Sequence, residues 1–345
     1  MTGDEVPTSA ARPRIALLGA AGALELAVHL RDAGADLIDV EPAPDAASDH
    51  LAARYGYRRL SARSGDVGNL SALTCILRSV QTGDLPARWI WRGADGALRD
   101  GLRASVDPDG IADAAELTFL RKAHLGALKS VLRDADDLIL LVSGEGCLVD
   151  PKDATPYPFH PAGDARLHKG MDLIHEYQDM ERLNADFTSL HGLLAELNPR
   201  LLIRLALVPV APREMFADFT TCLPALRHLS DLRVLMAHWA STLPRVSYLP
   251  IWEHCTGLLA QTGQFSAATG QVTPEGGAAL ARLCLGTPDV EATDLSSPAP
   301  EVVHVTEDLA QKKARRAERR AKRAGKGAAP DKVVCEEELL EAFSR

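Results

Sequence analysis

The chain has 345 residues, of which 46% are hydrophobic, 25% charged and 5% aromatic, a composition that predicts a soluble protein with an aliphatic core. No apolar run approaches the roughly 18 residues of a membrane span, and the polar start of the chain predicts no secretory signal. The six cysteines form no C-x-x-C pair, which argues against a disulfide framework or a zinc site and predicts reduced thiols in the cytoplasm.

The net charge of −9 is unevenly distributed. Residues 312–326 contain nine lysines and arginines and one glutamate, a local charge of +8, so the rest of the chain carries −17. The sequence therefore predicts an acidic body with a basic C-terminal arm.

From the N-terminus, a polar leader over residues 1–13 precedes an alternation of short apolar strands and amphipathic helices. Such an alternation predicts an α/β domain over residues 14–286, a three-layer doubly wound parallel sheet. We expect strands at residues 15–18, 37–40, 89–91, 138–142, 201–208 and 246–249, and helices at 24–30, 71–80, 112–133, 172–197, 223–241 and 273–285.

The first strand ends in the glycine turn Gly19-Ala20-Ala21-Gly22. The turn has neither the G-x-G-x-x-G spacing nor the lysine of a phosphate-binding loop, and it has no serine or cysteine for a nucleophile elbow. We interpret it as a tight strand-to-helix turn and predict no cofactor and no metal.

The composition changes after Gly286. Residues 287–330 form a Pro- and Ser-rich linker followed by the basic, alanine-rich stretch, and residues 331–345 form a short acidic and apolar segment. The partners predicted for residues 312–345 are a protein or an anionic surface, either nucleic acid or membrane; a solvated tail without a partner is the alternative.

Five features occur in a characteristic order: Gly68-Asn69 before a helix, Trp89–Trp91, Asn198-Pro199, Ser247–Glu253, and Val272–Gly276 before the last helix. In this order they resemble the GSCFA family, a branch of the SGNH/GDSL-type hydrolases. The resemblance covers residues 15–285 and implies a flavodoxin-like SGNH fold. It also implies an activated serine after the first strand, oxyanion donors that include a Gly-Asn pair, and an Asp and a His before the last helix.

The three catalytic positions that the resemblance implies carry no catalytic group here. They are occupied by Ala20, Ala268 and Gln271, whereas acyl transfer needs a hydroxyl, a base and an orienting carboxylate. We therefore expect a catalytically inactive hydrolase fold. The residues expected to line its cleft are Gly19, Ala20, Gly68, Asn69, Ser143, Gly144, Glu145 and Gln271.

Other polar residues leave alternatives open. Ser143 or Ser64, paired with a histidine from residues 160–175 or with His254, would make a relocated nucleophile and base. His160, Asp164, His168 and His175 lack the regular spacing of a metal site, and His124 is expected to be a hydrogen-bonded core histidine. Trp89 and Trp91 are expected in the core, with sugar stacking as the alternative.

The sequence thus supports three hypotheses. The first is a non-catalytic binding or scaffolding protein in cell-surface polysaccharide metabolism, with a carbohydrate or acylated small-molecule ligand. The second is an active hydrolase or acyltransferase with the relocated pair. The third is an adaptor that contacts a polyanion or membrane surface through the basic tail.

Overall fold

The computed structural model describes residues 12–20, 24–59, 62–65, 67–84, 89–93, 95–101, 103, 106–157, 173–209, 219–267 and 269–286, with the side chains of 219–222 left out. These residues all belong to the first of two units of the chain, Met1–Asp289 and Val290–Arg345. The predicted linker and tail, most of the leader, Ala268, His160, Asp164 and His168 lie outside the described residues.

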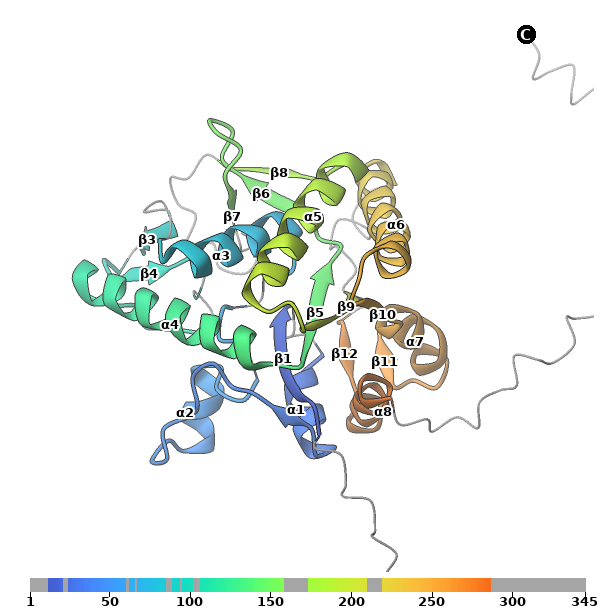
Figure 1. Cartoon of the computed structure of the whole chain (residues 1–345), viewed down its shortest axis with the longest axis horizontal. Helices are drawn as coiled ribbons and strands as arrows, with labels where there is room; N and C mark the ends of the chain where they lie inside the picture. Colours follow the sequence, from blue (N-terminus) through green and yellow to red (C-terminus); the bar gives the residue numbers. More distant parts are fainter. Residues whose placement is uncertain are drawn as a thin grey trace, which may run out of the picture. The chain divides into compact units, whose positions relative to one another are not determined.

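A five-stranded parallel sheet forms the centre of the described unit (Figure 1). In space the order is β10-β9-β5-β1-β2, and every neighbouring pair is parallel. Numbered along the chain, the five strands lie in the order 2-1-3-4-5, so the winding direction reverses between β1 and β5. Their bounds are β1 Arg14–Gly19, β2 Asp36–Leu37, β5 Asp137–Ser143, β9 Leu202–Val208 and β10 Val246–Leu249.

Alternate residues of the strands point to opposite faces of the sheet, and helices cover both faces. Leu138, Leu140 and Val142 of β5 belong to a core with α3, α4, α5 and α6, whereas Ile139 and Leu141 belong to a core with α1, α7 and α8. The helices are α1 Leu26–Asp32, α2 Asp49–Arg54, α3 Leu70–Thr82, α4 Ala114–Asp134, α5 Met180–Leu197, α6 Phe219–Thr242, α7 Ile251–His254 with a π-helical continuation Cys255–Leu259, and α8 Pro274–Leu285.

Three small antiparallel sheets surround the central one. Strands β3 (Ile90–Arg92) and β4 (Leu98–Asp100) form a hairpin, and β6 (Cys147–Val149) pairs with β7 (Pro156–Tyr157) and β8 (Ile174–Glu176). The third sheet is the hairpin of β11 (Phe265–Ser266) and β12 (Gln271–Val272). No helix in the part of the chain that the structure describes is long and apolar enough to cross a membrane.

The parallel sheet confirms the predicted α/β class, and two predicted elements were wrong in extent. The helix expected from residue 172 begins at Met180, because Ile174–Glu176 pairs with β6 and Asp179 caps the helix by accepting from the Arg182 amide. The second strand has only two residues in place of the expected 37–40. Trp89 and Trp91 are buried in the core, as expected.

Candidate functional site

The turn after β1 lies tightly against β5 at the carboxyl edge of the sheet, where the strand order reverses. Gly19 has a φ of +112°, and a Cβ built there would lie 2.0 Å from the carbonyl oxygen of Leu141. The Ala20 amide donates to the same carbonyl oxygen at 3.0 Å. Only glycine fits at residue 19, and its presence positions Ala20 at the strand end, where ligands of doubly wound sheets bind.

Ala20, Gly68 and Ser143 meet at this edge. The carbonyl oxygen of Gly68 accepts from the Ser143 amide at 2.9 Å. A Cβ built on Gly68 would lie 2.2 Å from Ser143 Oγ and 3.0 Å from Ala20 Cβ, so these three residues fill the space between the ends of β1 and β5. The structure thus brings together three of the residues that the sequence predicted for the cleft.

Ser143 has no activating base among the described residues. The residue is 4% exposed, and its Oγ makes no hydrogen bond to a described residue. His175 instead donates from Nε2 to the main-chain oxygen of Glu145 at 2.6 Å, and His254 lies in the short helix α7. The predicted pairing of Ser143 with either of these histidines is therefore absent.

Asn69, expected as an oxyanion donor, is used by the fold. It caps α3, with Oδ1 accepting from the Ala72 amide at 2.8 Å and from Cys147 Sγ at 3.4 Å. Its Nδ2 donates to the Tyr157 main-chain oxygen at 3.3 Å. The amide therefore holds the start of α3 against β6 and β7.

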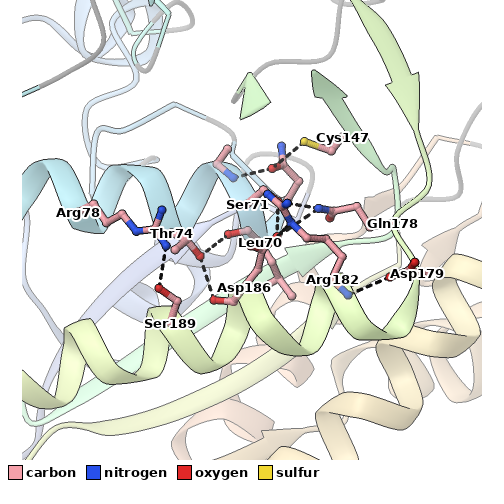
Figure 2. A network of polar contacts seen from close by, with 12 residues as sticks. Leu70, Ser71, Thr74, Arg78, Cys147, Gln178, Asp179, Arg182, Asp186 and Ser189 are labelled. Atoms are coloured by element: carbon pink, nitrogen blue, oxygen red, sulfur yellow. Dashed lines mark hydrogen bonds and ion pairs between the residues drawn. The ribbon is translucent and has the colours of Figure 1, made fainter. Parts of the chain in front are cut away.

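A buried polar network continues from this cap into α5 (Figure 2). Asp186 Oδ2 accepts from Ser71 Oγ, from Gln178 Nε2 at 3.2 Å and from Arg182 Nε at 3.1 Å. Gln178 Nε2 also donates to Ser71 Oγ at 2.6 Å. The network therefore fixes Gln178 and joins the first turn of α3 to α5.

Gln178 also lines a cavity of about 450 Å³ between the start of α5 and the first half of α6. Its volume falls in the range of small-molecule sites. A Cβ built on Gly144 would touch Leu229 of α6, so α6 packs on the segment that follows β5. The cavity is lined by Tyr177, Gln178, Asp179, Leu223, Pro224, Arg227 and His228.

The remaining predicted cleft residues, Glu145 and Gln271, do not contribute a side chain to this junction. Glu145 accepts a hydrogen bond from His175 through its main-chain oxygen. Gln271 is exposed in the β11–β12 hairpin, before α8, which packs on α1. Thr273 caps α8 with its hydroxyl, as the predicted helix start requires. No described contact joins Gln271 to Ala20 or Ser143.

A second polar cluster joins Ser64, His124 and Glu41 in a continuous chain. Ser64 Oγ lies 3.1 Å from His124 Nε2, and His124 Nδ1 lies 3.0 Å from Glu41 Oε1. Ser64 and His124 are 1% and 2% exposed. The order hydroxyl, imidazole, carboxylate is that of a nucleophile, a base and an orienting acid.

Two arginines share the Glu41 carboxylate with this histidine: Arg63 Nε and Arg103 Nη2 lie 2.7 and 2.6 Å from Oε2. Burial alone would raise the pKa of Glu41, but the hydrogen bond from His124 and the arginine charges outweigh it and lower that pKa to about 2. Burial lowers the pKa of His124, and the charges of Arg103 and Arg63 oppose the effect of Glu41. At neutral pH the imidazole is therefore neutral and acts on Glu41 as an N–H donor.

This environment suits a structural role better than acyl transfer. Proton transfer from Ser64 would create an imidazolium beside two guanidiniums that face a single carboxylate, which is electrostatically unfavourable. Arg63 has a φ of +48° and Gly65 a φ of +76°, so the cluster holds a tightly bent loop that leads to Gly68.

Thiol nucleophiles are also disfavoured among the described cysteines. Burial raises the pKa of Cys147, Cys255 and Cys284 to about 12. Each is therefore a neutral thiol at physiological pH.

The sequence predicted that His124 is a hydrogen-bonded core residue, and the structure confirms it. The sequence, however, did not indicate that Glu41, 83 residues away, is the partner of His124, or that His228 pairs with Gln178. Such contacts depend on the packing of separate elements, for which the spacing of residues carries no signal.

Among the residues that the structure describes, no three His, Cys, Asp or Glu side chains are grouped to hold a metal ion. Comparison with known proteins gives no match to the chain from a family model, a curated protein or a solved structure.

Proposed function

We propose that the chain is a non-catalytic GSCFA-like protein with an SGNH-type fold, which binds a small ligand at the carboxyl end of its parallel sheet. Two findings support the fold assignment: the strand order 2-1-3-4-5 and the helices on both faces. The sequence resemblance supplies the family.

The observation that carries the proposal is the junction of Ala20, Gly68 and Ser143. A methyl group stands at the strand end where the resemblance requires a nucleophilic hydroxyl. The neighbouring Ser143 has no described base, and Asn69 donates its amide to the protein backbone. Without an activated nucleophile the covalent step of a serine hydrolase has no starting point.

The binding role is supported by the cavity between the starts of α5 and α6, and by the packing of Leu229 of α6 on Gly144, directly after β5. A role in cell-surface polysaccharide metabolism, and a cytoplasmic location, remain predictions from the sequence.

The test is fluorophosphonate labelling and p-nitrophenyl acetate hydrolysis with the full chain. We expect labelling far below stoichiometry and no turnover above a blank. A positive-control serine hydrolase confirms the probe. Stoichiometric labelling that disappears in Ser143→Ala would overturn the proposal.

One observation favours a second candidate, a serine hydrolase that uses Ser64. His124 Nε2 would take the proton of Ser64 Oγ as that oxygen attacks an acyl carbon, with Glu41 holding the imidazole. The burial of Ser64 and the two arginines weigh against it.

The same labelling experiment separates the two candidates. Stoichiometric modification of Ser64, lost in Ser64→Ala and in His124→Gln but retained in Ser143→Ala, would establish the second candidate. Absence of label on Ser64 in folded protein rejects it.

A further inference from the structure

His228 is a buried histidine whose hydrogen bonds define its tautomer. It is 3% exposed, and its Nδ1 lies 3.0 Å from the main-chain oxygen of Gln178. A carbonyl oxygen only accepts, so Nδ1 must carry the proton. Burial lowers the pKa of His228, and the Gln178 hydrogen bond and the Asp231 charge offset part of this effect. In the neutral ring, Nε2 is then an unprotonated acceptor.

The cavity is where this acceptor can find a partner. His228 is one of the cavity-lining residues, and its Nε2 makes no hydrogen bond within the described part of the chain. An acceptor that is accessible from a cavity gains a hydrogen bond when a ligand donates to it. The matching ligand group is a hydroxyl or an N–H.

The ring is held firmly in this position. The Gln178 side chain is fixed by Ser71 and Asp186, so the carbonyl that orients His228 belongs to an anchored residue. The centroid of the Tyr177 ring lies 5.6 Å from that of the His228 ring. Tyr177 in turn makes an edge-to-face contact with His175, with ring centroids 4.8 Å apart. A preorganised acceptor loses little conformational entropy when a ligand binds.

The rest of the lining describes the ligand. Leu223, Pro224 and the Tyr177 ring provide an apolar wall. Asp179 supplies a carboxylate and Arg227 an exposed guanidinium, 3.5 Å from Asp231. Arg227 is paired with Asp231 and Asp179 caps the start of α5, so both charges already have a partner, which disfavours a strongly charged ligand. Acceptors, donors and an apolar wall together suit a molecule with several hydroxyl groups and a C–H face.

We propose that this cavity binds an uncharged, hydroxyl-rich ligand of the saccharide class, with a ligand hydroxyl donating to His228 Nε2. The inference rests on the proposed binding function and adds to it a site, an essential acceptor and a ligand class.

The test uses the full chain and a panel of neutral sugars: glucose, N-acetylglucosamine, rhamnose and maltose. Long-range ¹H–¹⁵N spectra of the histidines should show His228 as the Nδ1–H tautomer. At least one sugar should shift its Nε2 resonance in a saturable way, with acetate and inorganic phosphate as anionic comparisons.

The matched variants are His228→Asn and His238→Asn. An asparagine amide can still donate to the Gln178 oxygen in place of Nδ1, but it provides no acceptor at the position of Nε2. His228→Asn should therefore remain folded and weaken sugar binding at least about tenfold, which is ~1.4 kcal/mol. His238 is exposed on the same helix, so His238→Asn should bind as the wild type does.

The inference is wrong if no sugar of the panel shifts His228, if His228→Asn binds with unchanged affinity, or if only the anions bind. Its failure is distinguishable from that of the proposed function. If no sugar binds and no serine is labelled by the fluorophosphonate, only the proposed ligand class is rejected. If a serine is labelled, the non-catalytic assignment is rejected, whether or not a sugar binds.

Discussion

At the scale of single residues, small side chains determine the chemistry of the sheet edge. The ends of β1 and β5 pack closely around Ser143 because Ala20 is small and Gly68 has no side chain. The hydroxyl that remains there is buried and has no described base. A packed junction thus occupies the end of β1, the position at which the family resemblance implies a nucleophilic serine.

Replacing Gly68 by alanine tests how tightly this junction is packed. The new Cβ would lie 2.2 Å from Ser143 Oγ and 2.7 Å from Ser143 Cβ, so Gly68→Ala should destabilise the protein by about 1–3 kcal/mol in urea unfolding. Ser143→Gly in the same chain should recover part of the loss. The control is Gly126→Ala, in open space on α4, which should stabilise by ~0.5–1 kcal/mol. Equal effects of the two alanines would contradict the packing.

The Ser64–His124–Glu41 cluster predicts how stability depends on pH. The pKa of His124 is lowered in the folded state, so below pH 6.5 the unfolded chain binds a proton at His124 more readily than the folded chain does. The free energy of unfolding therefore decreases as the pH is lowered. Glu41, with a pKa of about 2, stays ionised over the same range; its contribution, present above pH 4.5, declines only as pH falls from 4.5 toward 2.

His124→Gln should therefore reduce the slope of unfolding free energy against pH between 6.5 and 5.5, by at most about 1.4 kcal/mol per pH unit. His228 and His254, whose pKa values burial also lowers, maintain the rest of the slope. Urea unfolding at four pH values measures it, with the exposed His238→Gln as control. A slope identical in His124→Gln and wild type would show that His124 binds its proton equally well in both states.

At the scale of elements, the joint between α3 and α5 connects the sheet edge to the cavity. Asp186 is 8% exposed and accepts hydrogen bonds from the side chains of Ser71, Gln178 and Arg182. It therefore connects the first turn of α3 to α5. Thr74 adds a hydrogen bond from Oγ1 to the Asp186 main-chain oxygen at 3.1 Å.

Asp186→Asn should loosen this joint, because an amide keeps the volume but removes the charge and one acceptor. We expect a loss of about 1–3 kcal/mol and faster amide hydrogen exchange at the start of α3 and in α5. Exchange in α1 and α8, on the opposite face, should be unchanged. Asp134→Asn, at the exposed end of α4, is the control. Uniformly faster exchange in all helices would argue against a local joint.

The same elements indicate what the sequence could predict. Four of the five strands of the parallel sheet were placed correctly, since runs such as Leu138–Val142 are buried on both faces and read as continuous apolar segments; the second strand was placed wrongly. The start of α5 was misplaced because Ile174–Glu176 depends on pairing with β6, a tertiary contact. The junction of Gly68 with Ser143 was predicted only through the family resemblance, and the His228 cavity could not be predicted because its walls come from separate helices.

At the scale of the whole molecule, the described fold ends in a complete helix cap. Gly286 has a φ of +66°, and its amide donates to the carbonyl oxygens of Arg282 and Leu283 at the end of α8. The 59 residues that follow, 287–345, contain the +8 stretch and lie outside the described residues. The fold and the predicted basic arm can therefore be tested separately.

Truncation after Gly286 should leave the melting temperature of the fold nearly unchanged, because α8 keeps its cap and its contacts with α1. It should also remove salt-dependent retention on heparin, because it removes the nine clustered basic residues of 312–326 and leaves a chain with a net charge of −8. Heparin chromatography over a salt gradient and thermal unfolding of both chains measure the two effects. A full-length variant with Lys312, Lys313, Arg315 and Arg316 changed to glutamine separates charge from chain length, and it should elute at lower salt than the wild type. If retention is the same with and without residues 287–345, the C-terminal arm is not the element that contacts polyanions, and the adaptor hypothesis is wrong.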